Sequence, residues 1–167
     1  SQGLFPKVNT YDLFQDGSEV ISQNDKFQEY KGKVDLVFTS PPYFAKEAYS
    51  QDETQSYKKF GEYDEWRDGF LVPTLETCVE WLANERYLLW NISDVKFGKD
   101  MLPLAEDSNK ILESLGMKYV KTLKMSMAQM PGANRLDPET GLPMAKYSCK
   151  VNGIWLKYEP IFVYYKP

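Results

Sequence analysis

The chain contains no histidine among its 167 residues. This absence excludes Ser-His-Asp and Cys-His nucleophilic sites, His-ligated zinc, and histidine as a general base. Only two cysteines are present, Cys78 and Cys149, and they form no CxxC pair. A disulfide framework or a cysteine-rich metal site is therefore not expected, and the sequence favours a reducing, intracellular setting without a bound metal. Any chemistry must come from carboxylates, hydroxyls, amides, aromatic rings or a bound cofactor.

Long hydrophobic runs are also missing. No apolar run approaches the 18 residues that a membrane-spanning helix needs, and no signal-peptide pattern opens the chain. The composition is 43% hydrophobic and 26% charged, which is typical of one globular domain with a sizeable core. We therefore expect a cytoplasmic protein with no membrane partner.

Charge is distributed unevenly along the chain. Residues 1–116 hold 12 basic and 21 acidic side chains, whereas residues 117–167 hold 8 basic and 3 acidic ones. A basic end of this kind can face a phosphate backbone. An ordinary solvated surface gives the same count, so the asymmetry needs a second signal before it indicates a partner.

Strand-like runs alternate with helical patterns, which predicts an α/β fold with a mostly parallel sheet. The last two strand-like runs follow each other without a helix, so we expect one antiparallel edge. Asp64 is the expected N-cap of a helix that Pro73 kinks or splits, and Gly116 is the expected end of a second helix. The expected strands are 33–39, 86–93, 117–127, 154–156 and 160–165, with a weaker candidate at 8–14; the expected helices cover 64–82 and 101–115, and the expected loops cover 44–62 and 128–150.

The segment that carries chemistry is Ser40-Pro41-Pro42-Tyr43-Phe44, directly after the 33–39 strand. Ligands of α/β proteins bind at the carboxyl ends of parallel strands. The two prolines fix the backbone and remove two N–H donors, which leaves carbonyl oxygens free to accept hydrogen bonds. A hydroxyl, one or two carbonyls and the flat faces of Tyr43 and Phe44 suit a planar ring that bears an amino group.

This segment resembles motif IV of the DNA methyltransferases that methylate adenine N6 or cytosine N4. Three later segments are similar to the strands and helix that follow in that family, so the resemblance covers most of residues 33–167. It implies a partial Rossmann-like, S-adenosylmethionine-dependent methyltransferase fold. The later segments are Leu88–Asp94, Ile111–Lys118 and Lys157–Lys166.

The resemblance also implies roles for individual residues. Ser40 and the Pro41 carbonyl would accept hydrogen bonds from the amino group of a flipped-out base of double-stranded DNA, stacked on Tyr43. Phe44 would either assist the stacking or, equally, belong to the core. The 128–150 segment would be an inserted loop that contacts DNA phosphates, although it could equally be a disordered excursion. The residues expected to make these phosphate contacts are Arg135, Lys146 and Lys150.

The cofactor part of the family pattern is absent. The family binds S-adenosylmethionine through a glycine-rich loop, and no such loop occurs in this sequence. We therefore expect residues 1–167 to be the catalytic part of one domain, truncated at its N-terminus, with the missing strands before Ser1. Asp12, Asn91 and Asp94 are the weak candidates for cofactor contacts. The alternatives are a surface turn for Asp12, a backbone hydrogen bond for Asn91 and a capped turn for Asp94.

The predicted function is DNA amino-methylation, with cytosine N4 slightly favoured over adenine N6 because Ser replaces Asp or Asn before the prolines. The isolated chain would be inactive without the cofactor half. The stretch from Glu47 to Tyr57 is similar to versions in phage and plasmid proteins, which favours a bacterial or phage restriction-modification context. Two alternatives remain: a catalytically inactive nucleic-acid-binding or regulatory module, and a methyltransferase acting on protein glutamine or RNA.

Overall fold

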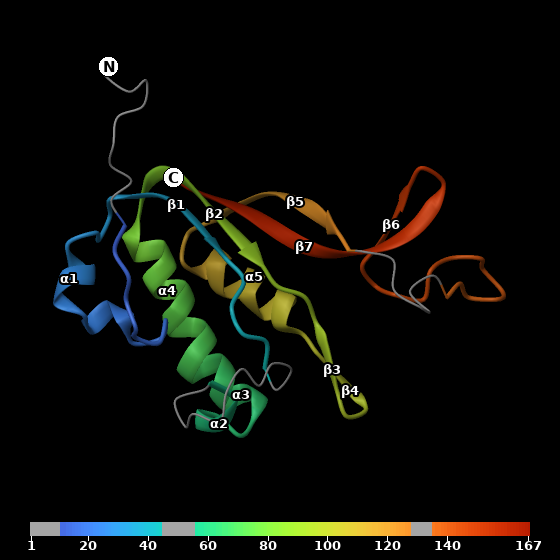
Figure 1. Cartoon of the computed structure of the whole chain (residues 1–167), viewed down its shortest axis with the longest axis horizontal. Coiled ribbons are helices and arrows are strands. Elements are labelled where there is room, and N and C mark those ends of the chain that lie inside the picture. Colours follow the sequence, from blue (N-terminus) through green and yellow to red (C-terminus); the bar gives the residue numbers. More distant parts are fainter. Residues whose placement is uncertain (1–10, 45–55, 128–134) are drawn as a thin grey trace, which may run out of the picture.

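The computed structural model describes residues 11–44, 56–127 and 135–167 (Figure 1). The helical elements are η1 (Ile21–Gln23), α1 (Asp25–Gln28), α2 (Ser56–Lys59), α3 (Tyr63–Trp66), the π-turn η2 (Arg67–Leu71), α4 (Val72–Trp81) and α5 (Leu104–Ser114). The strands are β1 (Val34–Thr39), β2 (Leu82–Asn91), β3 (Val95–Phe97), β4 (Asp100–Leu102), β5 (Lys118–Ser126), β6 (Ser148–Val151) and β7 (Ile154–Lys166). In the described part of the chain, no helix is both long and apolar enough to cross a membrane.

The main sheet has the order β1-β2-β7-β5, and β6 pairs with the beginning of β7. β1 and β2 are parallel, whereas β7 is antiparallel to β2, β5 and β6. The expected α/β class is confirmed. A mostly parallel sheet with one antiparallel edge was predicted, whereas in the described residues only β1 and β2 pair in parallel and β7 lies between β2 and β5. The two runs predicted at the end of the chain form one continuous strand, β7, which pairs antiparallel with β2, β5 and β6.

Helices α4 and α5 pack on one face of this sheet. Their buried leucines join Leu88 and Trp90 of β2 and Phe162 and Tyr164 of β7 in a single core. The alternating residues of β1 point to the opposite face, where Leu36 is 54% and Phe38 is 61% exposed. The described residues therefore cover one face of the sheet at the β1 edge and leave the other open.

Pro73 shapes the helix before β2. The chain passes through the π-turn η2, in which the Val72 amide donates to the Arg67 carbonyl five residues back, and Pro73 follows in the first turn of α4. Proline has no amide hydrogen, so it fits at a helix start and interrupts a longer one. The predicted break at Pro73 is confirmed, but Glu62 rather than Asp64 precedes the first helical residue.

Gly116 ends α5 as predicted, with φ at +83°. Other boundaries differ from the prediction. The predicted 44–62 loop contains α2, and the predicted 128–150 loop ends inside β6. Tyr11–Phe14 form no strand. Residues 8–10, 45–55 and 128–134 of these predicted segments lie outside the described residues.

The hairpin of β3 and β4, which turns at Gly98, was not predicted. Its strands have three residues each, which is too short to show a period in the sequence.

Candidate active site

Ser40-Pro41-Pro42-Tyr43 leaves the sheet at the carboxyl end of β1. Thr39, the last residue of β1, pairs with Trp90 near the end of the parallel strand β2. The Ser40 side chain is exposed, Pro41 is buried and Tyr43 is half-buried against the core. An exposed serine therefore lies on a backbone segment that two prolines constrain, at the sheet edge where ligands of α/β folds bind.

Phe44 lies inside an aromatic cluster and is only 3% exposed. Its ring centroid is 5.8 Å from that of Tyr63, 6.0 Å from Trp66 and 5.5 Å from Phe97. A ring enclosed on these sides has a packing role: it fixes the turn that presents Tyr43. The predicted stacking surface for a base consequently rests on Tyr43.

Tyr63 connects the aromatic cluster to α5. Its hydroxyl donates to Asp107 Oδ2 at 2.7 Å. Burial of the ring, together with this hydrogen bond, raises the pKa of Tyr63 well above its usual range. Tyr63 therefore stays neutral at physiological pH and acts as a hydrogen-bond donor between α3 and α5.

Asn91 and Asp94 follow each other at the carboxyl end of β2, and both are engaged within the protein. The buried Asn91 amide donates to the Pro160 carbonyl at 3.0 Å, which ties β2 to β7. Asp94 Oδ1 accepts from the Ala105 amide at 3.0 Å at the start of α5. These contacts match the backbone-bonding and capping alternatives for the two residues.

The second oxygen of Asp94 binds the segment that leads to β6. Asp94 Oδ2 forms an ion pair with Lys146 and receives a weaker 3.4 Å contact from the Tyr147 hydroxyl. The carboxylate is only 4% exposed, while the Lys146 side chain is largely exposed. The hydrogen bond to Asp94 raises the pKa of Lys146 above its ordinary value. Lys146 is thus an anchor of the predicted phosphate-binding loop, with its charge directed at Asp94.

A cavity of about 320 Å³ lies beside this ion pair. Ser93 and Asp94 line it from the end of β2, and Tyr158 and Glu159 line it from β7. The cavity lies near the same edge of the sheet as Ser40, because these residues follow the register of β2 and β7 past Asn91. This edge therefore combines the exposed Ser40 with a hollow in which Asp94, Lys146 and Glu159 lie beside apolar side chains such as Met101 and Met127.

Asp12 lies in different surroundings. Its carboxylate pairs with Lys26 and accepts a hydrogen bond from the Tyr30 hydroxyl. The Lys26 contact, followed by the Tyr30 contact, lowers the pKa of Asp12. Asp12 therefore belongs to a surface cluster with α1, in line with the surface alternative for this residue.

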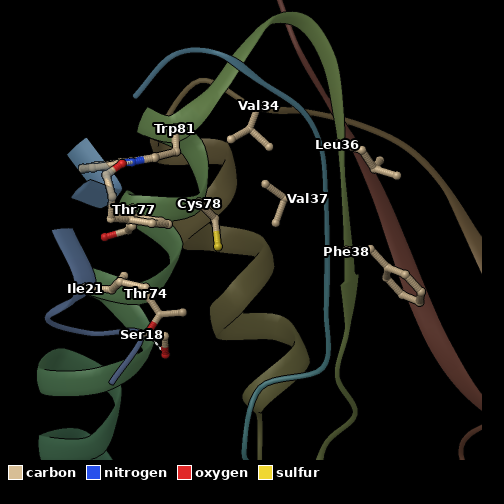
Figure 2. Close-up of a pocket in the computed structure, with 11 residues that line it drawn as sticks. Ser18, Ile21, Val34, Leu36, Val37, Phe38, Thr74, Thr77, Cys78 and Trp81 are labelled. Carbon is tan, nitrogen blue, oxygen red and sulfur yellow. Dashed lines mark hydrogen bonds between the residues drawn. The ribbon is translucent and has the colours of Figure 1, made fainter. Parts of the chain in front are cut away.

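A second cavity, of about 350 Å³, lies between β1, α4 and the segment that includes η1 (Figure 2). Val34 and Val37 point from β1 toward Thr74 and Cys78 of α4, whereas Leu36 and Phe38 point away from the helix. Burial raises the pKa of Cys78 to about 12, so this thiol is protonated and unreactive at neutral pH. The cavity is apolar and offers no catalytic group.

Arg135 and Lys150 lie apart from Asp94. The Arg135 carbonyl accepts from the Met144 amide at 3.0 Å, and its side chain is exposed. Lys150 lies in β6 directly opposite Trp155 of β7, with its ammonium 5.8 Å from the ring centroid. Within the described residues, no group of three His, Cys, Asp or Glu side chains could hold a metal ion.

Sequence reasoning missed the pairing of Lys150 with Trp155 and of Lys124 with Tyr158. The signal for the first pair is Asn152-Gly153, a two-residue hairpin turn that places residues 150 and 155 opposite each other. The second pair, with 5.2 Å between the ammonium and the ring centroid, joins β5 to β7 across a long loop and has no local signal.

Comparison with known proteins agrees with the architecture. Two structures of TTHA0409 from Thermus thermophilus, named "Putative DNA Modification Methylase", superpose with TM-scores of 0.57 and 0.52 at 18% and 19% identity. The matches cover 90% and 86% of this chain but 50% and 53% of those chains, so the chain spans about half of their length. The second of these structures is complexed with S-adenosyl-L-methionine. No curated protein sequence matches the chain.

A sequence-family match covers most of the chain. The DNA methylase family (N6_N4_Mtase) matches residues 34–167, a range that begins with β1 and includes Ser40-Pro41-Pro42-Tyr43 as well as β7. The fold, the position of this motif at the carboxyl end of β1, and the family match agree: the chain belongs to the DNA methylase family.

Proposed function

We propose that this chain is the catalytic part of an S-adenosylmethionine-dependent DNA methyltransferase that modifies the exocyclic amino group of cytosine or adenine. The observation that carries the proposal is the exposed Ser40 hydroxyl followed by two fixed prolines at the carboxyl end of β1, in a chain of the DNA methylase family. A restriction-modification context in a bacterium or phage is part of the same proposal.

In this proposal the chain prepares the methyl acceptor. The amino nitrogen of adenine or cytosine is conjugated with its ring and is a poor nucleophile. The Ser40 hydroxyl and the Pro41 carbonyl accept hydrogen bonds from its two N–H groups, which favours a tetrahedral nitrogen with an available lone pair. Preorganised acceptors and a fixed orientation lower the barrier without a histidine base.

The base must leave the duplex to reach this edge. Tyr43 is half-buried against the core, so its ring has a defined position on which an extruded base can stack. Phe44 supports that position from inside the aromatic cluster. Both bases would make the same amino contacts, and the preference for cytosine N4 over adenine N6 rests on Ser40 alone.

The described residues do not form a fitting site for S-adenosylmethionine. Asp12, Asn91 and Asp94 are engaged with Lys26, the Pro160 carbonyl and the α5 start, respectively. The cofactor-binding half would therefore come from chain outside these 167 residues, expected before Ser1. Its natural place is the edge of β1, because within the described residues β1 pairs only with β2 and exposes Leu36 and Phe38.

Mass spectrometry of nucleosides tests the reaction. DNA from cells that produce the protein from its complete reading frame should contain N4-methylcytosine or N6-methyladenine, and a Ser40→Ala variant should abolish most of that product. N6-methyladenine alone would reverse the preference for cytosine. The absence of both products would support a catalytically inactive nucleic-acid-binding module. Methylated glutamine or RNA would support a methyltransferase that acts on protein glutamine or RNA.

A further inference from the structure

Most described basic side chains before β5 have a carboxylate partner, although Lys33, Lys96 and Lys99 have none within 4 Å among the described residues. In the part before β5, ion pairs with carboxylates engage Lys26, Lys31, Lys59, Arg67, Arg86 and Lys110. After residue 123 we define the basic arm as residues 124–127 and 135–158, which hold five basic and two acidic side chains. Within the described residues, only Lys146 of this arm has a carboxylate partner within 4 Å.

Three lysines of the arm lie over aromatic rings, and one of them, Lys146, also binds a carboxylate. Before β5, Lys31 likewise combines a ring, with 5.0 Å to the Trp81 centroid, with a carboxylate partner. The ammonium of Lys124 lies 5.2 Å from the ring centroid of Tyr158, that of Lys150 lies 5.8 Å from Trp155, and that of Lys146 lies 5.5 Å from Tyr147. Among the described residues, the arm therefore holds three such contacts, and the part before β5 holds one. A ring orients the ammonium and leaves its positive charge available to an external anion.

The arm is also a projecting ribbon. Figure 1 shows β6 and the start of β7 extending past the helices at one end of the molecule. Cys149 faces Leu156 and Lys150 faces Trp155 across the hairpin, and Asn152-Gly153 form its turn. Alternation along β7 places Trp155 and Lys157 on one face and Tyr158, with Lys124 over its ring, on the other. Basic groups therefore flank both faces of the ribbon.

We propose that the basic arm grips duplex DNA, with the β6–β7 ribbon in the major groove and Lys124, Lys150 and Lys157 toward the phosphates on either side. The inference rests on the proposed function, which makes DNA the substrate. The major groove, about 12 Å wide, admits a two-stranded ribbon. A ribbon with cations on both faces meets the phosphate strands on both sides of that groove. The uneven distribution of charge along the sequence did not by itself indicate a partner. The lack of carboxylate partners for these lysines within the described residues, and the contacts of Lys124 and Lys150 with aromatic rings, are the additional evidence for a polyanionic partner.

The tip of the ribbon lies at a distance from the reacting base, whereas Lys124 lies closer to it, at the level of Pro160. Thr39 pairs with Trp90 of β2, which pairs with Phe162 of β7, and from Phe162 strand β7 extends eight residues back to Ile154. At about 3.3 Å per residue this is roughly 25 Å, or about seven base pairs. The tip of the ribbon therefore contacts flanking DNA, and removal of the basic side chains weakens binding through lost phosphate contacts.

The test is the salt dependence of binding to a fluorescent 24-base-pair duplex by the 167-residue chain. The arm variant carries Lys124→Gln, Lys150→Gln and Lys157→Gln. The matched control carries Lys26→Gln, Lys31→Gln and Lys110→Gln, which changes the net charge equally but removes lysines already paired with carboxylates. Losing three phosphate contacts should lower the slope of log K against log[salt] by about three and the affinity about 100-fold near 0.15 M salt. The control should retain the wild-type slope.

Further variants and substrates distinguish the possible outcomes. Arginine at the same three arm positions should restore the slope, and all variants should keep the wild-type melting temperature because the side chains are exposed. An arm variant that binds like wild type, or a control that loses as much, would overturn the proposal. Equal loss on single-stranded DNA would overturn groove insertion. If the arm variant lowers the slope but the wild-type protein methylates no base, the arm proposal stands and the proposed reaction is wrong. If the wild-type protein methylates DNA but the arm variant leaves the slope unchanged, the reaction stands and the arm proposal is wrong.

Discussion

The part of the chain before β5 and the basic arm solve the same problem, a surface rich in charge, in opposite ways. Before β5, most of the described basic side chains bind nearby carboxylates, as Lys26 binds Asp12 and Arg86 binds Asp35. In the arm, Lys124 and Lys150 lie over aromatic rings instead. Ion pairs within a protein neutralise its surface, whereas lysines over rings keep a field that attracts anions. The charge pattern therefore separates the part that folds from the part that meets a polyanion.

Burial divides the molecule along the same line. The core joins α4 and α5 to the sheet through residues such as Leu75 and Leu112, which are fully buried. The arm exposes its apolar side chains, including Leu142, Met144 and Ile154. Since burial of apolar surface is the main source of stability, the helix-covered part carries the fold and the arm depends on β7, which continues into the core.

Two leucine substitutions test this division and give the largest expected change in stability. Leu112→Ala in α5 should lower the free energy of unfolding by about 2–5 kcal/mol, because it leaves a cavity in the core. Leu142→Ala in the arm removes the same atoms from a side chain that is 57% exposed, so the change should be below about 0.5 kcal/mol. Urea denaturation measures both. Similar losses would show that the arm has a core of its own.

The second prediction separates reaction from binding. Ser40→Ala should lower turnover of the active protein about 100-fold, the size of effect that follows from removing one preorganised polar contact to the reacting group. Its affinity for duplex DNA should change less than twofold, because the phosphate contacts proposed for the arm remain. Single-turnover methylation and anisotropy measure the two quantities. Equal losses in both would remove Ser40 from its proposed role.

Much of the fold could be predicted because its signals are local. The 33–39 run is apolar and ends at two prolines, and Gly116 closes α5, so both boundaries follow from the backbone preferences of these residues. The position of Ser40–Tyr43 directly after this strand follows from the same local signals. These features depend on neighbours in the sequence and not on distant packing.

The remaining features depend on contacts between distant residues. Asp94 binds Lys146, 52 positions away, and Asn91 binds the Pro160 carbonyl, 69 positions away. Their residue types suit a ligand pocket as well as a structural bond, so the sequence left both readings open. The burial of Phe44 likewise depends on Phe97, which belongs to a hairpin too short to predict.

The smallest predicted effect concerns the ion pair that anchors the arm to the rest of the molecule. Lys146→Gln leaves the Asp94 carboxylate, only 4% exposed, without its cation, while the Ala105 amide still binds its other oxygen. Because Lys146 itself is largely exposed, solvent screening limits the cost to about 1 kcal/mol. Lys110→Gln is the matched control: both members of the Lys110–Glu106 pair are exposed, so its effect should be smaller.

The contribution of the Lys146–Asp94 ion pair to stability should change with pH in one direction. The hydrogen bond to Asp94 raises the pKa of Lys146 above its unfolded value of 10.5. A group whose pKa is higher in the folded state stabilises fully below its unfolded pKa and loses that contribution as pH rises through the folded pKa. The difference in unfolding free energy between wild type and Lys146→Gln should therefore stay constant from pH 7 to about 9.5 and shrink above about 10.5. A difference that grows with pH over this range would mean that the charge of Lys146 does not hold the arm.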